Sequence, residues 1–108
     1  MTTEPEVVEE PGHGLMGLER TFRKGPVSVE VYGIDGTTDP RKDYPDTTFT
    51  DDEVRAWKKG EVFVFWVYYH DGEADVDGNY YGWDQVEPEA RQALAQAWQR
   101  YVAEGGAA

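Results

Sequence analysis

The sequence predicts an α+β fold in which a small antiparallel sheet packs against two helices. Two stretches, residues 17–34 and 61–81, combine strand-forming residues with a turn signal near their middle. Helix start and stop signals bound a short segment at 51–59 and a longer one at 87–104. A chain of 108 residues has the length of one domain, so these elements are expected to share a single core.

The first hairpin is predicted from alternation after a turn. Lys24-Gly25-Pro26 is a turn signal, and Val27, Val29 and Val31 then alternate with more polar residues. The following residues 36–49 contain two prolines and show no periodicity. They are predicted to form a long surface loop.

Both helices have recognisable ends. Thr50 and Glu53 have the spacing of a capping box, and Gly60 follows the lysines of the last turn, which predicts a helix over 51–59. In the second helix Pro88 is expected in the first turn, and apolar residues recur at spacings of three and four until Gly105.

Residues 1–12 are expected to be a disordered acidic tail, leaving residues 13–108 as the folded domain. The tail holds four glutamates and two prolines without a basic residue, a composition that buries too little apolar surface to offset its ordering entropy. Removing it leaves 18 acidic and 10 basic residues, so acidity belongs to the domain as well.

The charge balance limits the classes of partner. Asp and Glu number 22 against 10 Lys and Arg, a formal net charge of −12, which disfavours direct binding to nucleic acid. The expected partner is a basic surface of another protein. No cysteine is present, and neither a secretory signal nor a membrane-spanning stretch is found, so we expect a cytoplasmic protein without cofactors or membrane contact.

The stretch EADVDGNYYGWD, residues 73–84, admits two interpretations. One is a calcium-binding loop of the EF-hand kind, because oxygen-bearing residues and a glycine fall at the spacing of that template. Its ligands would be Glu73, Asp75, Asp77, Asn79 and Asp84. The stretch departs from the template in its first and last ligands and in following a strand-like segment.

The favoured interpretation is a hairpin that turns at Asp71-Gly72, a dipeptide suited to two-residue turns. That turn would place His70 opposite Glu73, and so on along the strands. The pairs expected on one face are Tyr68–Asp75, Trp66–Asp77 and Val64–Asn79, and those on the other are Tyr69–Ala74, Val67–Val76, Phe65–Gly78 and Phe63–Tyr80. Such a row splays its acids along a strand, so no metal site is expected.

The aromatic strand at 61–70 is apolar on both faces, which predicts a central strand covered on both sides. The second helix is expected to cover Trp66 and Tyr68; exposed, these rings beside a row of acids would make a protein-binding surface. The candidate acidic binding residues are Asp39, Asp43, Asp46, Asp51, Asp52, Glu73, Asp75 and Asp77. The candidate aromatic anchors are Trp66, Tyr68, Tyr81 and Trp83.

No catalytic residue is predicted. His70 beside Glu73 is interpreted as a pair of surface partners, and no nucleophile, phosphate-binding or dinucleotide motif occurs.

The strand, Asp-Gly turn, Tyr-Gly-Trp-Asp segment and amphipathic helix of residues 61–104 resemble the short uncharacterised acidic proteins of bacteriophages of high-GC bacteria. The resemblance implies a role in the contest between phage and host. Small acidic proteins in that setting can imitate nucleic acid and block the basic groove of a host enzyme. It implies no catalytic residues.

Three functions follow as hypotheses. The first is a non-enzymatic acidic domain that binds a basic surface of another protein, as a phage-type inhibitor does. The second is a calcium-binding module built on residues 73–84. The third is a structural or assembly component that acts as an oligomer, which a measurement of mass in solution would reveal.

Overall fold

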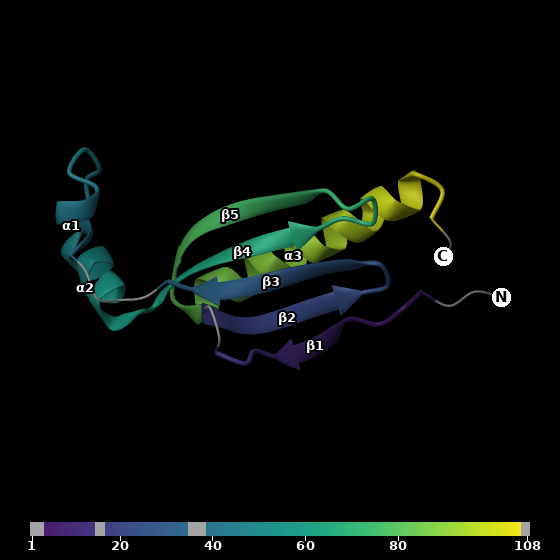
Figure 1. Ribbon diagram of the computed structural model, residues 1–108, viewed down its shortest axis with the longest axis horizontal. Coiled ribbons are helices and arrows are strands. Elements are labelled where there is room, and N and C mark those ends of the chain that lie inside the picture. The colour runs from purple at the N-terminus through teal and green to yellow at the C-terminus, as the bar shows by residue number, and fades with distance from the viewer. Residues whose placement is uncertain (1–3, 15–16, 35–38, 107–108) are drawn as a thin grey trace.

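The computed structural model describes residues 4–14, 17–34 and 39–106, and it contains one five-stranded antiparallel sheet backed by a long helix (Figure 1). The strands, which neighbour one another in chain order, are β1 (Val8–Pro11), β2 (Leu18–Lys24), β3 (Val27–Gly33), β4 (Val62–Tyr68) and β5 (Ala74–Tyr81). The helices are α1 (Pro40–Asp43), α2 (Asp51–Lys59) and α3 (Trp83–Ala103). The predicted α+β class is confirmed.

The core lies between α3 and one face of the sheet, which we call the helix face. The buried residues of α3 recur every three or four positions: Val86, Ala90, Leu94, Ala97 and Trp98. The buried residues that face them from β2, β3 and β4 are Phe22, Val27, Val29, Val31, Phe65 and Val67. In Figure 1 α3 runs behind the sheet and no helix lies in front of β3 and β4; we call that uncovered side the open face.

The N-terminal segment differs from the expected disordered tail. Val8–Pro11 forms β1 and pairs with β2, with Glu9 opposite Phe22 and Glu10 opposite Thr21. Arg20 lies 2.6 Å from Glu9 and Arg23 lies 2.7 Å from Glu10, joining side-chain nitrogen to carboxylate oxygen. The glutamates that suggested disorder are therefore the partners of the arginines of β2. Residues 1–3 lie outside the described part of the chain.

The two short helices form a lobe beyond one end of the sheet, at the left of Figure 1, within a molecule whose extents are 54 × 27 × 21 Å. The prediction of α2 is confirmed, including its capping box: Glu53 N–H donates to Thr50 Oγ1 (3.1 Å) and Thr50 N–H donates to Glu53 Oε1 (2.8 Å). The segment expected to be a loop contains α1, whose N-terminus Asp39 caps. The expectation that the helix predicted over 87–104 covers Trp66 is wrong, since that residue is 38% exposed.

Helix α3 begins four residues earlier than the sequence predicts. Val86 N–H donates to the carbonyl of Gly82, and Tyr81 N–H donates to the side chain of Gln85, so backbone groups are satisfied well before Pro88. Pro88 consequently lies inside the helix rather than in its first turn. The predicted end is correct: Gly105, at φ +89°, donates to the carbonyl of Val102.

The β4–β5 hairpin exists, but its predicted register is wrong by one residue over most of its length. Tyr69 N–H donates to the carbonyl of Glu73, and Gly72, at φ +90°, donates to the carbonyl of Tyr69. The loop therefore holds three residues, His70, Asp71 and Gly72, instead of two. A three-residue loop whose last residue adopts positive φ is a common alternative to the two-residue turn.

The observed pairs are Tyr68–Ala74, Val67–Asp75, Trp66–Val76, Phe65–Asp77 and Val64–Gly78. A register irregularity at Gly78 and Asn79 then restores the predicted pair Phe63–Tyr80. Because side chains alternate between faces, the one-residue shift moves Asp75 and Asp77 to the helix face. Trp66 and Tyr68 remain on the open face, opposite Val76 and Ala74.

Strand β4 is neither central nor covered on both sides, as the sequence suggested. The central strand is β3, and β4 lies next to the edge strand β5. The apolar residues on both faces of β4 have different roles: Phe65 and Val67 are buried under α3, whereas Trp66 faces solvent.

Candidate functional site

The predicted acidic residues do not form one surface. Asp39, Asp43, Asp46, Asp51 and Asp52 lie in and around the α1–α2 lobe, whereas Glu73, Asp75 and Asp77 follow the turn that precedes β5. In Figure 1 the lobe lies beyond one end of the sheet and the turn between β4 and β5 lies at the other. These are two separate acidic groups.

The lobe acids are largely engaged in local structure. Asp39 accepts a hydrogen bond from Arg41 N–H (2.9 Å), Asp51 lies 3.1 Å from the Arg41 guanidinium, and Asp52 lies 3.2 Å from that of Arg55. Such exposed pairs contribute roughly 0.2–1 kcal/mol each. Of these, the ion pair of Arg41 with Asp51 joins α1 to the start of α2, and Asp39 caps α1.

Two acids of the second group border a groove between β5 and α3, of about 240 Å³. Asp75 and Asp77 line it from the strand, and Glu89 lines it from the helix. The remaining lining residues are neutral: Phe65, Val67, Tyr69, Gln92, Ala93 and Gln96. The groove therefore combines three carboxylates with an apolar floor and has no basic residue in its lining.

Tyrosine hydroxyls hold two of these carboxylates in position. Tyr69 donates to Asp75 Oδ2 (2.9 Å), and Tyr80 donates to Asp77 Oδ2 (2.7 Å) while its ring stacks on Phe65 at 5.6 Å between centroids. Burial first, and then the hydrogen bond to Asp77, raises the pKa of Tyr80 to about 12. Burial and Asp75 raise the pKa of Tyr69 in the same way.

The pKa of Tyr80 predicts a loss of stability at alkaline pH. Because its folded pKa is raised from 10.0 to about 12, the unfolded chain loses the proton first. The stabilisation is therefore present below pH 10 and lost as the pH rises towards 12. We expect thermal melting to show a falling midpoint over this range and Tyr80→Phe to reduce the fall. Tyr44→Phe, which removes an exposed hydroxyl, is the control; equal falls in the wild type and Tyr80→Phe would contradict the assignment.

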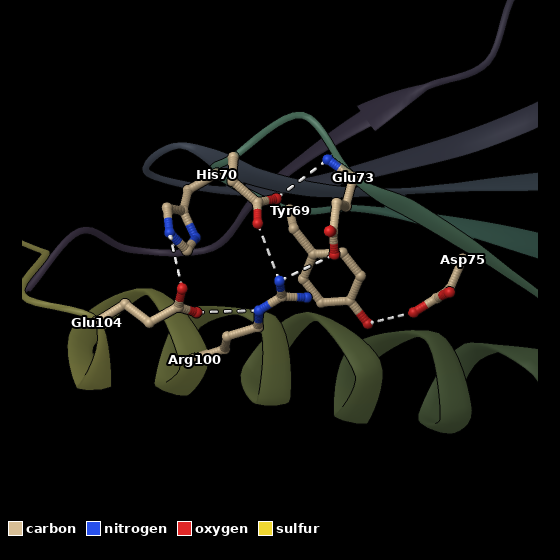
Figure 2. A network of polar contacts seen from close by, with 7 residues as sticks. Tyr69, His70, Glu73, Asp75, Arg100 and Glu104 are labelled. Carbon is tan, nitrogen blue, oxygen red and sulfur yellow. Dashed lines mark hydrogen bonds and ion pairs between the residues drawn. The ribbon is translucent and has the colours of Figure 1, made fainter.

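The hairpin end next to the groove is tied to α3 by Arg100 (Figure 2). Its guanidinium lies 2.9 Å from Asp71, 3.0 Å from Glu73 and 3.0 Å from Glu104, and 4.4 Å from the centroid of the Tyr69 ring. These partners raise the pKa of Arg100, with the hydrogen bond to Glu73 as the first cause. Glu73 N–H in turn donates to Asp71 (3.0 Å), and this bond is the main cause that lowers the pKa of Asp71.

Two predictions for this end are therefore corrected. Glu73 is an ion-pair partner of Arg100 and does not line the groove. His70 does not pair with Glu73: its Nε2 lies 3.9 Å from Glu104, and its ring packs on Tyr101 at 5.1 Å between centroids. The reason is the extra loop residue, which turns His70 towards α3.

The candidate aromatic anchors are also divided between places. Trp66 and Tyr68 lie on the open face, where Glu30 of β3 is the neighbouring carboxylate; burial and then the hydrogen bond to Glu30 raise the pKa of Tyr68 to about 12. Trp83, the first residue of α3, packs edge-on to Phe63 and lies 5.2 Å from the Arg20 guanidinium. Trp83 therefore contributes to packing, and Trp66 is the exposed ring.

Tyr81 belongs to a second hollow, of about 280 Å³, between the end of β5 and the lobe. Its hydroxyl lies 3.2 Å from Trp57 Nε1, and the rings of Tyr44 and Phe49 pack on Trp57 at 6.0 and 6.2 Å. Sequence patterns did not single out Tyr44, Phe49 and Trp57 as members of a site. Tyr44 and Phe49 lie in a segment without periodicity, where aromatic content was the available signal, and Trp57 lies in the correctly predicted helix over 51–59.

The calcium-loop interpretation is not supported. Residues 74–81 are a strand, and Asp84 lies in the first turn of α3. Over residues 4–14, 17–34 and 39–106, no three His, Cys, Asp or Glu side chains are grouped so that they could hold a metal ion. The alternating acids are spaced out along a strand, so their carboxylates do not converge on one ion.

Comparison with family models, with curated proteins and with solved structures finds no match. Within the described part of the chain, no helix has the length and apolar character needed to cross a membrane.

Proposed function

We propose that this protein acts by binding, and that the groove between β5 and α3 receives a basic segment of another protein. The observation that carries the proposal is the arrangement of Asp75, Asp77 and Glu89 around an apolar floor without a basic residue. A lysine or arginine side chain suits such a groove, because its aliphatic stem packs on apolar surface while its charged end meets carboxylates.

The distribution of ion pairs supports the groove as the binding site. All six arginines of the chain lie within 4 Å of a carboxylate: Arg20, Arg23, Arg41, Arg55, Arg91 and Arg100. Among the described residues, none of these cations pairs with Asp75, Asp77 or Glu89. The groove acids are therefore available to pair with a ligand. The chain's net charge of −12 also attracts basic partners from a distance.

We further propose that the partner is a nucleic-acid-binding protein whose basic surface the groove occupies, as a phage-type inhibitor would. A surface that contacts phosphates presents lysine and arginine side chains in rows. A row of carboxylates along β5, with Glu89 opposite, offers such a surface several ion pairs at once. Complementary charge raises the rate of encounter and excludes partners of the wrong charge.

Neutralising the groove should weaken binding far more than neutralising the lobe. After affinity capture and mass-spectrometric identification of a partner, its dissociation constant is measured for Asp75→Asn/Asp77→Asn/Glu89→Gln. We expect the dissociation constant to rise about 10- to 100-fold, because the variant loses its ion pairs with the basic segment. Each tenfold step corresponds to about 1.4 kcal/mol. Binding by the wild type should also weaken as ionic strength rises.

The matched control is Asp43→Asn/Asp51→Asn/Asp52→Asn, which removes the same number of charges from the lobe. We expect it to slow association with little change in dissociation. Equal losses in the two triple variants would show that only net charge matters and would overturn the groove as the site. Binding that is insensitive to salt would overturn the basic partner.

A further inference from the structure

We infer that the basic segment binds in an extended conformation, as a sixth strand added antiparallel to β5. This inference rests on the proposed function and specifies how the partner is recognised. Strand β5 is the last strand of the sheet, and its residues 74–79 are exposed. Sheet edges recognise extended segments through backbone hydrogen bonds, while alternate side chains provide specificity.

The hydrogen-bond pattern identifies the backbone groups that are available. Tyr69 and Glu73 form a hydrogen-bonded pair at the start of the hairpin. Hydrogen-bonded and non-hydrogen-bonded pairs alternate along an antiparallel ladder, so Val67–Asp75 and Phe65–Asp77 are also hydrogen-bonded pairs. Ala74 and Val76 therefore direct their N–H and C=O groups away from β4, towards a possible sixth strand.

The acids of β5 determine which strand can be added. Proteins protect exposed sheet edges with charged side chains and irregularities, and β5 has both: Asp75, Asp77 and the register irregularity at Gly78. A second copy of β5 would bring like charges together across the new pair of strands. A strand with lysine or arginine on the helix face places opposite charges there, so the same acids that oppose self-association favour a basic strand.

The register also determines how the added strand must alternate. Its residues opposite Asp75 and Asp77 carry side chains on the helix face, over the groove that Glu89 and Gln92 line. Its residues opposite Ala74 and Val76 carry side chains on the open face and direct their own N–H groups at β5. The partner segment should therefore alternate basic residues with small or β-branched ones.

A synthetic octapeptide that alternates lysine with threonine tests this arrangement. Four peptides are tested for binding to the wild-type protein. They are the unmodified peptide, the peptide N-methylated at its threonine amides, the peptide N-methylated at its lysine amides, and one with glutamine in place of lysine. Threonine amides are the ones that would face β5, so their methylation should weaken binding at least tenfold. Lysine amides would face solvent, so their methylation is the matched control and should change binding less than threefold.

Hydrogen exchange supplies an independent readout. Binding of the unmodified peptide should slow exchange of the Ala74 and Val76 amides, which otherwise face solvent. Equal binding by the unmodified and the two N-methylated peptides, without protection of these amides, would overturn strand addition while leaving the proposed basic partner intact. Failure of the unmodified peptide to bind would overturn both. If the glutamine peptide binds as tightly as the unmodified peptide, the proposal of a basic partner is contradicted. Strand addition then stands if the Ala74 and Val76 amides are protected, and it is overturned if they are not.

Discussion

Truncation of Leu94 to alanine should lower the free energy of unfolding by about 2–5 kcal/mol. Leu94 is 1% exposed and lies in the middle of α3, between Ala90 and Trp98, where it packs on the helix face of the sheet. Removing its side-chain carbons loses the free energy gained by burying them and leaves a cavity. The sheet and the helix pack closely around this site, so the cavity cannot close fully. For a domain of this size, such a loss is a large fraction of the total stability.

Urea denaturation followed by circular dichroism measures this effect. The control is Gln99→Ala, an exposed substitution in the same helix, for which we expect a change within about 0.5 kcal/mol. A loss below about 1 kcal/mol for Leu94→Ala would contradict the placement of α3, because it would mean that this face of the helix is not in the core.

Substitution of Gly78 by alanine should destabilise the protein by about 1–3 kcal/mol, the usual cost of overpacking. An added Cβ would clash with Val64 Cγ1 and would lie only 3.2 Å from Val64 Cα, so this part of the hairpin would have to shift. The clash arises because the register places Gly78 opposite Val64 on the open face. The expected measurement is again the free energy of unfolding.

A second substitution makes this prediction specific for the register. Val64→Ala removes the nearest clashing atom, so Val64→Ala/Gly78→Ala should lose less stability than the sum of the two single changes. Phe65→Ala is the control, because the register derived from the sequence would have placed Gly78 opposite Phe65. Coupling of Gly78→Ala to Phe65 instead of Val64 would reject the observed pairing and, with it, the position of Asp75 and Asp77 in the groove.

The hairpin illustrates how far local sequence signals can reach. Asp71-Gly72 correctly marks the turn. The β-branched and aromatic run before it and the alternation after it correctly predict the two strands. Two- and three-residue loops differ little in local free energy, and the choice between them depends on which side chains the rest of the fold buries. Phe65 and Val67 face α3 in either register, and only the side chains of β5 change face. The longer loop brings Asp75 to the Tyr69 hydroxyl, Asp77 to the Tyr80 hydroxyl and Glu73 to Arg100, which are contacts that no local signal encodes.

The same dependence on distant residues explains the N-terminal strand and the division of the acidic residues. A segment of glutamates and prolines has no internal reason to order, but Arg20 and Arg23 of β2 provide cross-strand partners for Glu9 and Glu10. The eight predicted acidic residues share composition but not location. Their positions depend on the placement of the lobe at one end of the sheet, which no periodicity reveals.

The sequence by itself determined the fold class, the β2–β3 hairpin, the capped α2, the end of α3 and the acidity of the chain, because each depends on neighbouring residues or on composition. The tertiary structure alone decided the register of β5, the open face around Trp66, the start of α3 and the groove of Asp75, Asp77 and Glu89. These depend on which surfaces are buried together. A one-residue change in a loop, of small local cost, turns every side chain of a strand to the opposite face.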